Sequence, residues 1–219
     1  MHRSLKVLML SLACLAAAAQ ARTLREAVQL AGPQDGYDKY VVLETGEIYT
    51  GGLQIGPSLV PFTGIFYGEE GYDLRIVGNG ALLDLEGQRL CISYCNNRLD
   101  IDDCIVINGD IRYRGVNWIQ YVGVPTGFVR HVTFYGPHDH GVKMMGAGTG
   151  ITLERNLIVN AVDTGFEYIY TTGISSDWIP TGASVALSMQ GGSPQVRENW
   201  SFHGSGHDNA NLLRHFVFL

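Results

Sequence analysis

The stretch GFVRHVTFYGPHDHGVKMMGAGTGITLERNLIVNAVDTG, residues 127–165, decides the fold because it contains a repeat. Sliding the sequence by 43 residues places Leu153 on Val196 and Asn156 on Asn199. Sliding it by 24 residues places 139–141 (DHG) on 163–165 (DTG). Each copy has a short apolar strand, a glycine turn and a second strand ending in Arg-Asn or Glu-Asn, and then a third strand and a polar turn. A segment this short cannot bury its apolar face alone, so we expect the copies to stack on one another.

The length and spacing of the apolar pieces predict an all-β protein. The repeat is about 20 to 27 residues long and its apolar pieces span about 3 to 5 residues, which suits three short strands per turn of a parallel helix. Leucine-rich repeats have a similar period, but they need leucines at fixed offsets that this chain lacks. Alternation along each strand predicts an interior lined by Val142, Met144, Leu153, Phe166, Tyr168, Val185, Leu187 and Val196.

On these residues the chain from about 23 to 219 resembles the right-handed parallel β-helix superfamily, the pectin-lyase-like fold of polysaccharide-lyase-type proteins. In that family an asparagine often occupies the tight turn between the second and third strands, and such asparagines stack as a ladder. Asn156 and Asn199 stand where that residue would be, and His131 or Cys104 stands at the equivalent point of less regular coils. The resemblance implies a right-handed, single-stranded parallel β-helix, a solenoid.

The two ends of the chain predict export and a domain that is incomplete or associates. Residues 1–21 have a signal peptide pattern: a basic start with Arg3 and Lys6, an apolar run over 7–19 and an A-x-A cleavage site at 19–21. That apolar run is too short to span a membrane comfortably, so we expect a secreted or periplasmic protein, or one at the cell surface, without a membrane span. Residues 22–219 are then one β-helix domain, and its apolar end at 216–219 predicts a fragment of a longer product or an associating chain.

Local patterns place the first elements after the signal peptide. Residues 23–31 (TLREAVQLA) predict a short amphipathic helix with Thr23 as N-cap and Glu26 three residues on, which would cap the first coil. Strands are expected over 40–43, 46–49, 72–84 and 99–107, the third of them containing the Gly-Asn-Gly turn at 78–80. The domain therefore begins with a helix and continues as stacked strands.

Charge and cysteine content limit the partners. The whole chain has 15 basic and 21 acidic residues, and removal of Arg3 and Lys6 leaves 13 basic ones and a net charge near −8. Such a surface repels phosphate backbones and excludes nucleic acid as a partner. An anionic polysaccharide would also be repelled unless a local basic site or a bridging cation compensates. Cys91, Cys95 and Cys104 are an odd number, and we weigh a disulfide with one thiol left over against thiols stacked in the core.

Repetition gathers the polar residues of separate coils into one predicted patch. If Val142 and Met144 fill the core, Lys143 points outward, and Glu167 of the next coil lies about 4.8 Å away as its lateral neighbour. Asn117 is expected one coil before Lys143. The turns that lead into this sheet complete the patch with His138, Asp139, His140, Asp163, His207 and Asp208.

The resemblance implies that this patch acts on a polysaccharide. Lyases of the superfamily use a basic residue on this sheet to remove the proton next to a uronate carboxylate, whose charge calcium or a positive side chain neutralises. In this chain Lys143, His140 and Glu167 would be catalytic, while His138, Asn117 and His207 would bind substrate. Asp139, Asp163 and Asp208 offer the oxygen ligands that Ca²⁺ prefers.

Other interpretations of the same residues stay open. Lys143 and Glu167 can form a simple cross-strand ion pair, and aspartates at turns can bond their own backbone. A glycoside hydrolase on the same fold could use Asp139 and Asp163 as its acid and base. A non-catalytic, adhesive solenoid could bind glycans through exposed aromatic residues, of which the candidates are Trp118, Trp178 and Trp200.

Overall fold

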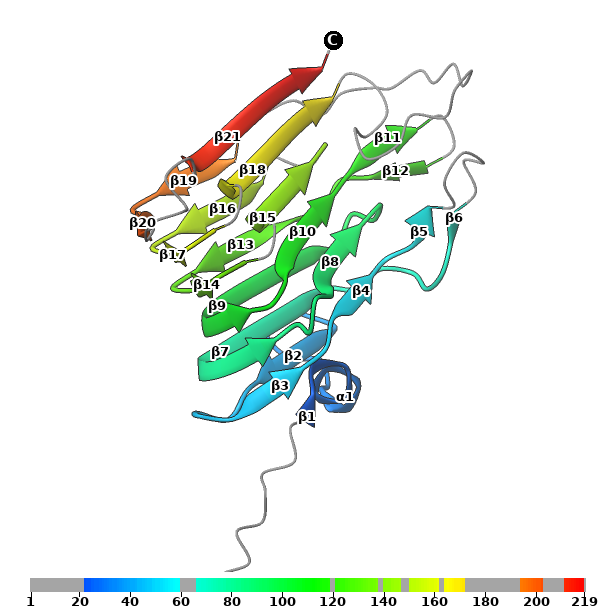
Figure 1. Cartoon of the computed structure of the whole chain (residues 1–219). Helices are drawn as coiled ribbons and strands as arrows, with labels where there is room; N and C mark the ends of the chain where they lie inside the picture. Colours follow the sequence, from blue (N-terminus) through cyan, green and yellow to red (C-terminus); the bar gives the residue numbers. More distant parts are fainter. Residues whose placement is uncertain are drawn as a thin grey trace, which may run out of the picture.

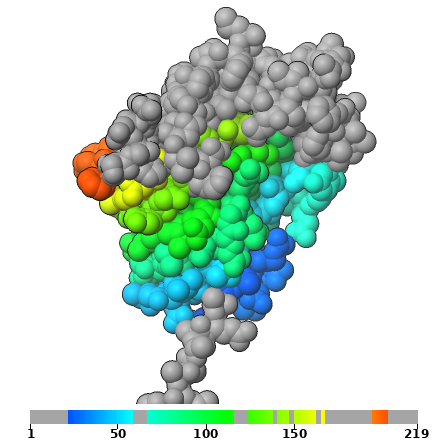
Figure 2. Space-filling model, in the orientation of Figure 1, coloured from blue at the N-terminus to red at the C-terminus, as the bar shows by residue number. Residues whose placement is uncertain are grey.

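A computed structural model describes the protein over residues 22–59, 66–118, 121–137, 140–146, 150–161, 164–171, 194–202 and 211–218. Over these residues the chain is mostly β, with one short helix, so the predicted all-β class is confirmed. Parallel strands stack in layers from the N-terminal residues at the base (blue) to the C-terminal ones (red) in Figure 1. Figure 2 shows the same order of colours on the surface, with residues 194–202 (orange) at one edge.

Two sheets contain most of the described strands. The larger one, called the large sheet below, has eleven described strands: β1 (Arg22–Thr23), β2 (Lys39–Val42), β3 (Ile48–Thr50), β7 (Leu74–Asp84), β9 (Arg98–Ile107), β13 (Thr126–Arg130), β14 (Thr133–Tyr135), β16 (Ile151–Glu154), β17 (Leu157–Val159), β19 (Gln195–Arg197) and β20 (Trp200–Phe202). The six-stranded sheet contains β4 (Leu53–Ile55), β8 (Arg89–Ser93), β10 (Asp110–Arg114), β15 (His140–Met145), β18 (Thr164–Thr171) and β21 (Asn211–Phe218). Two antiparallel pairs lie outside both sheets: β5 (Ser58–Leu59) with β6 (Phe66–Tyr67), and β11 (Val116–Trp118) with β12 (Tyr121–Gly123).

The large sheet consists of two runs of parallel strands. The first run contains β2, the first half of β7, the first half of β9, β13, β16 and β19. The second run contains β3, the second halves of β7 and β9, β14, β17 and β20. Along the chain a strand of the first run is followed by one of the second run and then by a strand of the six-stranded sheet, and this order repeats.

The core lies between these three rows of strands, because apolar residues of successive strands are Cα partners. In the first run Ile76, Ile101, Val129 and Leu153 are partners in that order, and each is fully buried. Val196 follows Leu153 and packs against the same cluster while partly buried. A single short strand would leave such side chains in water. Stacking on neighbouring strands buries them.

The predicted interior residues agree with this core wherever the structure describes them. Val142, Met144, Leu153 and Phe166 are fully buried. Val185 and Leu187 lie outside the described residues, as does the side chain of Tyr168. The in-and-out alternation of β15 is therefore as predicted.

One corner of the stack has a left-handed residue in every layer. Between the two runs the backbone φ is +53° at Asn79, +55° at Asp103, +52° at His131, +52° at Arg155 and +52° at Glu198. Non-glycine residues adopt this region rarely, and asparagine and aspartate do so most readily. The repeated conformation turns the chain sharply from the first run to the second in each layer.

The predicted asparagine ladder follows this corner and contains two members. The side-chain oxygen of Asn199 accepts hydrogen bonds from the backbone N–H and the side-chain amide of Asn156, both at 2.9 Å. The Oδ1 of Asn156 in turn accepts from the backbone N–H of Val132 at 3.0 Å. Strand register makes Val132 and Cys104 the equivalent residues of the earlier layers, so Cys104 was correctly placed and His131 lies one position too early.

The 43-residue repeat is one step of the stack. Leu153 and Val196 are partners on neighbouring strands, and so are Leu157 and Trp200. This step is longer than the 24-residue step because it includes residues 172–193, which lie outside the described ranges. The 24-residue shift is also one step, because His140 partners Thr164.

Helix α1 (Leu24–Leu30) covers the first layer as predicted. Thr23 is its N-cap, and Thr23 and Glu26 form a capping box in which each side chain bonds the backbone of the other. Leu24 and Val28 are buried in the core cluster. The Nζ of Lys39 donates to the carbonyl of Ala31 at 2.7 Å, which satisfies a backbone acceptor just past the last turn. None of the described helical segments is both long and apolar enough to cross a membrane.

The three described cysteines are free and buried. Cys95 and Cys104 belong to the hydrophobic core cluster. Burial raises the pKa of the Cys91 thiol to about 11. The prediction of core thiols is thereby favoured over a disulfide.

Replacing Met144 with aspartate tests the assignment of the inner face. Met144 is fully buried, so Met144→Asp places a carboxyl group without a partner in the core. We expect the free energy of unfolding to fall by on the order of 3 kcal/mol or more, measured by urea denaturation. The control is Tyr135→Asp at a side chain that is 57% exposed, which should cost less than about 1 kcal/mol. Equal losses in the two variants would contradict the assignment.

Removing the Asn156 amide tests the ladder. Asn156 is fully buried, and its side chain also donates to the carbonyl of Val129 at 2.8 Å. Asn156→Ala leaves the Val132 N–H and the Val129 carbonyl without these bonds, and we expect a loss of about 1–3 kcal/mol for each group left unsatisfied. Asn199→Ala, at the partly exposed end of the ladder, should lower the melting temperature less. A larger loss for Asn199→Ala would show that the ladder is not anchored at Asn156.

Candidate functional site

Strand register confirms one pair of the predicted patch, Lys143 and Glu167. Lys143 lies on β15 between the buried Val142 and Met144, so its side chain is on the outer side of the six-stranded sheet. Its Cα partner on β18 is Glu167, as predicted. Its partner on β10, one strand earlier, is Arg112.

Two predicted members of the patch are placed elsewhere. Asn117 is not one layer before Lys143, because β11 leaves the stack and pairs antiparallel with β12. His140 is not an exposed turn residue, since it begins β15 and is only 1% exposed. Residues two apart on a strand share a face, so His140 lies on the same inner side as Val142. It therefore does not reach a substrate on the outer face.

The remaining predicted site residues stay predictions. His138, Asp139, Asp163, His207 and Asp208 lie outside the described residues, and so does the side chain of Glu167. Within the described ranges no group of three or more His, Cys, Asp or Glu side chains could hold a metal ion. The predicted calcium ligands belong to the part of the chain that these ranges leave out.

Basic residues gather on the outer side of the six-stranded sheet. Arg112 and Asp110 form a buried ion pair, with Nε–Oδ1 at 2.6 Å and Nη2–Oδ2 at 2.7 Å. Beside it a pocket of about 400 Å³ is lined by Arg25, Arg89 and Arg114, together with glutamine, glycine and apolar residues and Cys91. The lining contains no carboxylate, so the pocket is positive although the chain is acidic.

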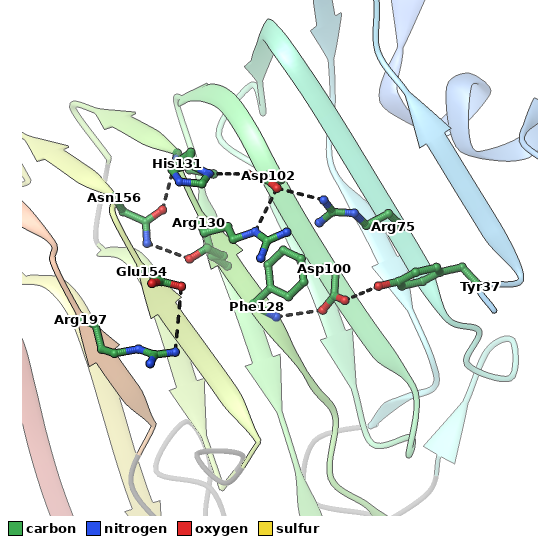
Figure 3. A network of polar contacts seen from close by, with 12 residues as sticks. Tyr37, Arg75, Asp100, Asp102, Phe128, Arg130, His131, Glu154, Asn156 and Arg197 are labelled. Atoms are coloured by element: carbon green, nitrogen blue, oxygen red, sulfur yellow. Dashed lines mark hydrogen bonds and ion pairs between the residues drawn. The ribbon is translucent and has the colours of Figure 1, made fainter. Parts of the chain in front are cut away.

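A second polar site lies on the outer side of the first run, where Figure 3 shows a network across β7, β9, β13, β16 and β19. Asp102 is its centre. Its carboxylate accepts hydrogen bonds from Arg75 Nη2 and Arg130 Nε at 3.0 Å each, and its other oxygen lies 2.8 Å from His131 Nδ1. Burial opposes ionisation of Asp102, but the bonds from His131, Arg75 and Arg130 outweigh it and lower the pKa of the carboxyl.

Phe128 lies between two of these arginines. The guanidinium carbon of Arg75 is 4.6 Å from the centre of the ring, and that of Arg130 is 4.1 Å from it. Such cation–π contacts stabilise a guanidinium over a ring by about 0.5–2 kcal/mol, with the larger values at desolvated positions. Arg130 is therefore held at two points, by the ring and by Asp102.

Asp100 occupies the neighbouring outward position of β9 and is only 2% exposed. It accepts hydrogen bonds from the Tyr37 hydroxyl at 2.5 Å and from the Phe128 N–H at 2.9 Å. Burial raises the pKa of the Asp100 carboxyl in spite of these bonds, and burial also raises the pKa of Tyr37, to about 12. Arg98 stacks on Tyr37, with its guanidinium carbon 4.0 Å from the centre of the ring.

The sequence signal of this network is a two-residue period that the prediction applied to the outer face only around Lys143 and Glu167. In 98–102 (RLDID), 128–130 (FVR) and 152–154 (TLE) a polar or aromatic residue alternates with a buried apolar one. The alternation indicates that each of these side chains is on the outer face. It does not indicate which of them meet, because their partners come from other layers.

Comparison of the chain with models of known protein families, with characterised proteins and with solved structures finds no match. No functional assignment therefore follows from a relative.

The pH dependence of stability tests the role of Asp102. A carboxyl whose pKa is lowered by folding stabilises the protein above its unfolded value of about 3.9, and this contribution is lost as pH falls through the folded value. Asp102→Asn should remove part of the stability that the parent loses at low pH, and it should cost on the order of 1–3 kcal/mol at neutral pH. The measurement is melting temperature between pH 2 and 7.

The matched control for this variant is Asp103→Asn. Asp103 is adjacent and exposed, and its positive φ is one that asparagine adopts readily. Its melting curve should follow that of the parent protein at every pH. The difference between Asp102→Asn and the parent should be largest near neutral pH and shrink as the pH falls; if Asp102→Asn follows the parent at neutral pH as well, the network does not stabilise the ionised Asp102.

Proposed function

We propose that the chain is a right-handed, single-stranded parallel β-helix of the pectin-lyase-like kind, exported from the cell, and that it cleaves a uronate-containing glycan by β-elimination. Support for the fold comes from the three rows of in-register parallel strands and from the asparagine pair at a repeated left-handed corner. Support for the reaction comes from the basic groups on the outer side of the six-stranded sheet.

The observation that carries the proposal is the group of arginines on the outer side of the sheet that contains Lys143. Arg112, the direct neighbour of Lys143, is paired with Asp110, but the pocket lined by Arg25, Arg89 and Arg114 contains no carboxylate. A net charge near −8 repels an acidic polymer on average, so a local basic surface is what such a ligand requires. Guanidinium groups also match the planar geometry of a carboxylate.

In the proposed reaction the neutral amine of Lys143 takes the proton on the carbon next to the uronate carboxylate. The released electron pair forms a carbon–carbon double bond, and the glycosidic C–O bond on the following carbon breaks. The departing oxygen takes up a proton and leaves as a hydroxyl group. Arginine side chains near the carboxylate would stabilise the charge that develops on it.

Calcium and the other predicted residues enter the proposal from the sequence. Asp139, Asp163 and Asp208 would hold Ca²⁺, and bound calcium would neutralise the same uronate carboxylate. His138 and His207 would contact the sugar. A proton donor other than His140 is needed, because His140 is buried on the inner side.

Binding without cleavage is the second candidate, and one observation favours it. Tyr135, Trp200 and Phe202 are exposed by 57%, 59% and 65% on the outer side of the second run. Tyr135, Val159 and Phe202 are consecutive partners there, so two aromatic side chains lie in one row. Exposed aromatic rows suit stacking on sugar rings, the property expected of an adhesive protein.

Replacement of Lys143 tests the lyase proposal. The parent protein, Lys143→Ala and Lys143→Arg are incubated with polygalacturonate, alginate and a glycosaminoglycan, and unsaturated uronates are measured by absorbance. We expect a loss of about 10²-fold or more in both variants, because arginine keeps the charge but is a poor base. An unchanged melting temperature would separate this loss from misfolding.

Each other result contradicts a stated part of the proposal. Full activity of Lys143→Ala contradicts a catalytic role for Lys143 and leaves its ion pair with Glu167 as the remaining interpretation. Shortening of the polymer without unsaturated ends identifies a hydrolase, and binding without shortening identifies an adhesive protein. Activity that survives a chelator contradicts the role of calcium while leaving Lys143 in place.

A further inference from the structure

A groove of about 430 Å³ lies on the outer side of the first run, away from the six-stranded sheet on which the proposed reaction takes place. Arg98, Arg130 and Arg197 line it, and its volume falls within the range of about 300–1,000 Å³ typical of small-molecule sites. These residues come from β9, β13 and β19, and Figure 3 shows Arg130 and Arg197 on this face with Glu154 of β16 between them.

Opposite charges are separated by depth in this groove. The side chains of Asp100 and Asp102 are 3% and 15% exposed, and their oxygens are occupied by partners within the network. The side chains of Arg98, Arg130 and Arg197 are 39%, 38% and 57% exposed. A ligand therefore meets guanidinium groups first, with the carboxylates beneath them.

Glu154 is the one described carboxylate that reaches this groove at intermediate exposure, 21% for its side chain. Arg197 Nη2 lies 4.0 Å from its Oε2, the limit for an ion pair, and Arg155 Nη2 lies 3.9 Å from its Oε1. Pairs as loose and exposed as these contribute little to stability. Arg197 is consequently available to a tighter partner.

Two of the three arginines, Arg98 and Arg130, are already held in position before a ligand arrives. Arg130 uses its Nε on Asp102 and its flat face on Phe128, and its two Nη groups make no hydrogen bond within the described structure. Arg98 is stacked on Tyr37, whose hydroxyl is fixed by Asp100. Because the side chains are pre-ordered, binding loses less conformational entropy than binding to free arginines.

The floor of the groove is small and polar. Thr126 and Thr152 are partly exposed between buried neighbours and line the same groove as the arginines. Gly127 keeps the floor tight against the preceding layer, because a Cβ there would come within 1.9 Å of the Leu99 carbonyl oxygen. Hydroxyl donors and guanidinium donors together suit an oxyanion attached to a polar ring.

We propose that this groove binds an acidic saccharide, with its carboxylate or sulfate ester held by Arg98, Arg130 and Arg197 and its ring over Thr126 and Thr152. The site is independent of cleavage at Lys143. If both sites bind, one glycan-binding surface lies on the large sheet and the other on the six-stranded sheet, so the protein could hold a polymer at two places.

The test is a titration of the ¹⁵N-labelled full chain with glucuronate, glucose 6-sulfate, glucose and inorganic sulfate, followed by amide chemical shifts. We expect the amides of Thr126, Gly127 and Thr152 to shift with the two acidic sugars and not with glucose. Stronger shifts with glucuronate or with the sulfate ester identify which acid group is preferred. Affinity should fall at higher salt, because the arginines are partly exposed.

Arg98→Gln and Arg197→Gln should each weaken binding about tenfold, as expected for loss of one charge-assisted contact. The matched control is Arg155→Gln, an exposed arginine that pairs with Glu198 at 2.6 Å at the corner and does not line the groove. Lys143→Ala should bind as the parent does, which separates this site from the proposed reaction. Loss of cleavage in that variant with the groove shifts intact supports both proposals.

Three outcomes would overturn the proposal. They are unchanged affinity in both Arg98→Gln and Arg197→Gln, equal shifts with glucose, and inorganic sulfate binding as tightly as the acidic sugars. The last would reduce the groove to a site for a bare anion. Failure of cleavage assays with every polymer would contradict the lyase proposal alone, because the titration does not depend on turnover.

Discussion

Hydrogen bonding in register between successive parallel strands is the constraint on which the rest of this structure depends. Because Ile101, Val129 and Leu153 are partners in consecutive strands, their side chains form one continuous column in the core. The same register aligns the outward residues between them into rows. A shift by one residue would exchange the two faces, placing charges inside and apolar side chains in water. Core packing and outer chemistry are therefore fixed together.

The corner between the two runs shows what this register requires of the backbone. Every layer turns through a residue with positive φ, including bulky ones such as Arg155 and His131. Single left-handed residues of this kind cost free energy, on the order of 1–2 kcal/mol. At the last described layers the Asn156 and Asn199 amides satisfy backbone groups next to the turn. The earlier layers place Val132 and Cys104 there, so the ladder strengthens only one end of the stack.

Asp102 shows how an acidic chain can present a basic surface. Its single carboxylate takes hydrogen bonds from Arg75 and Arg130 and contacts His131, and it is less exposed than Arg130 and His131. The half-buried negative charge of Asp102 holds several positive groups close together, although they would otherwise repel one another. The Asp110–Arg112 pair repeats the principle on the six-stranded sheet. At the Asp102 network Arg130 faces the groove while the carboxylate is less exposed, whereas the Asp110–Arg112 pair is buried as a whole.

What the sequence by itself determined are the features that depend on neighbours along the chain. The Thr23–Glu26 capping box, the burial of Val142 and Met144, and the Asn156–Asn199 pair were all readable from spacing and alternation. These patterns are local or exactly repeated, and the two-residue period of a strand leaves one choice of face.

Only the tertiary structure decided which outward residues meet. Asp102 and Arg130 are 28 residues apart, Val132 and Asn156 are 24 apart, and Asn156 and Asn199 are 43 apart, yet each pair joins adjacent layers. The connecting segments therefore differ in length by nearly twofold, so spacing predicts lateral neighbours only where the sequence itself repeats, as at Lys143 and Glu167. For that reason Arg112 rather than Asn117 lies beside Lys143, and the Asp102 network was not foreseen. Strand alternation sets the face of a residue. The length of the loop between two strands sets which residue of the next layer is its neighbour, and where each loop begins and ends is decided only when the layers pack.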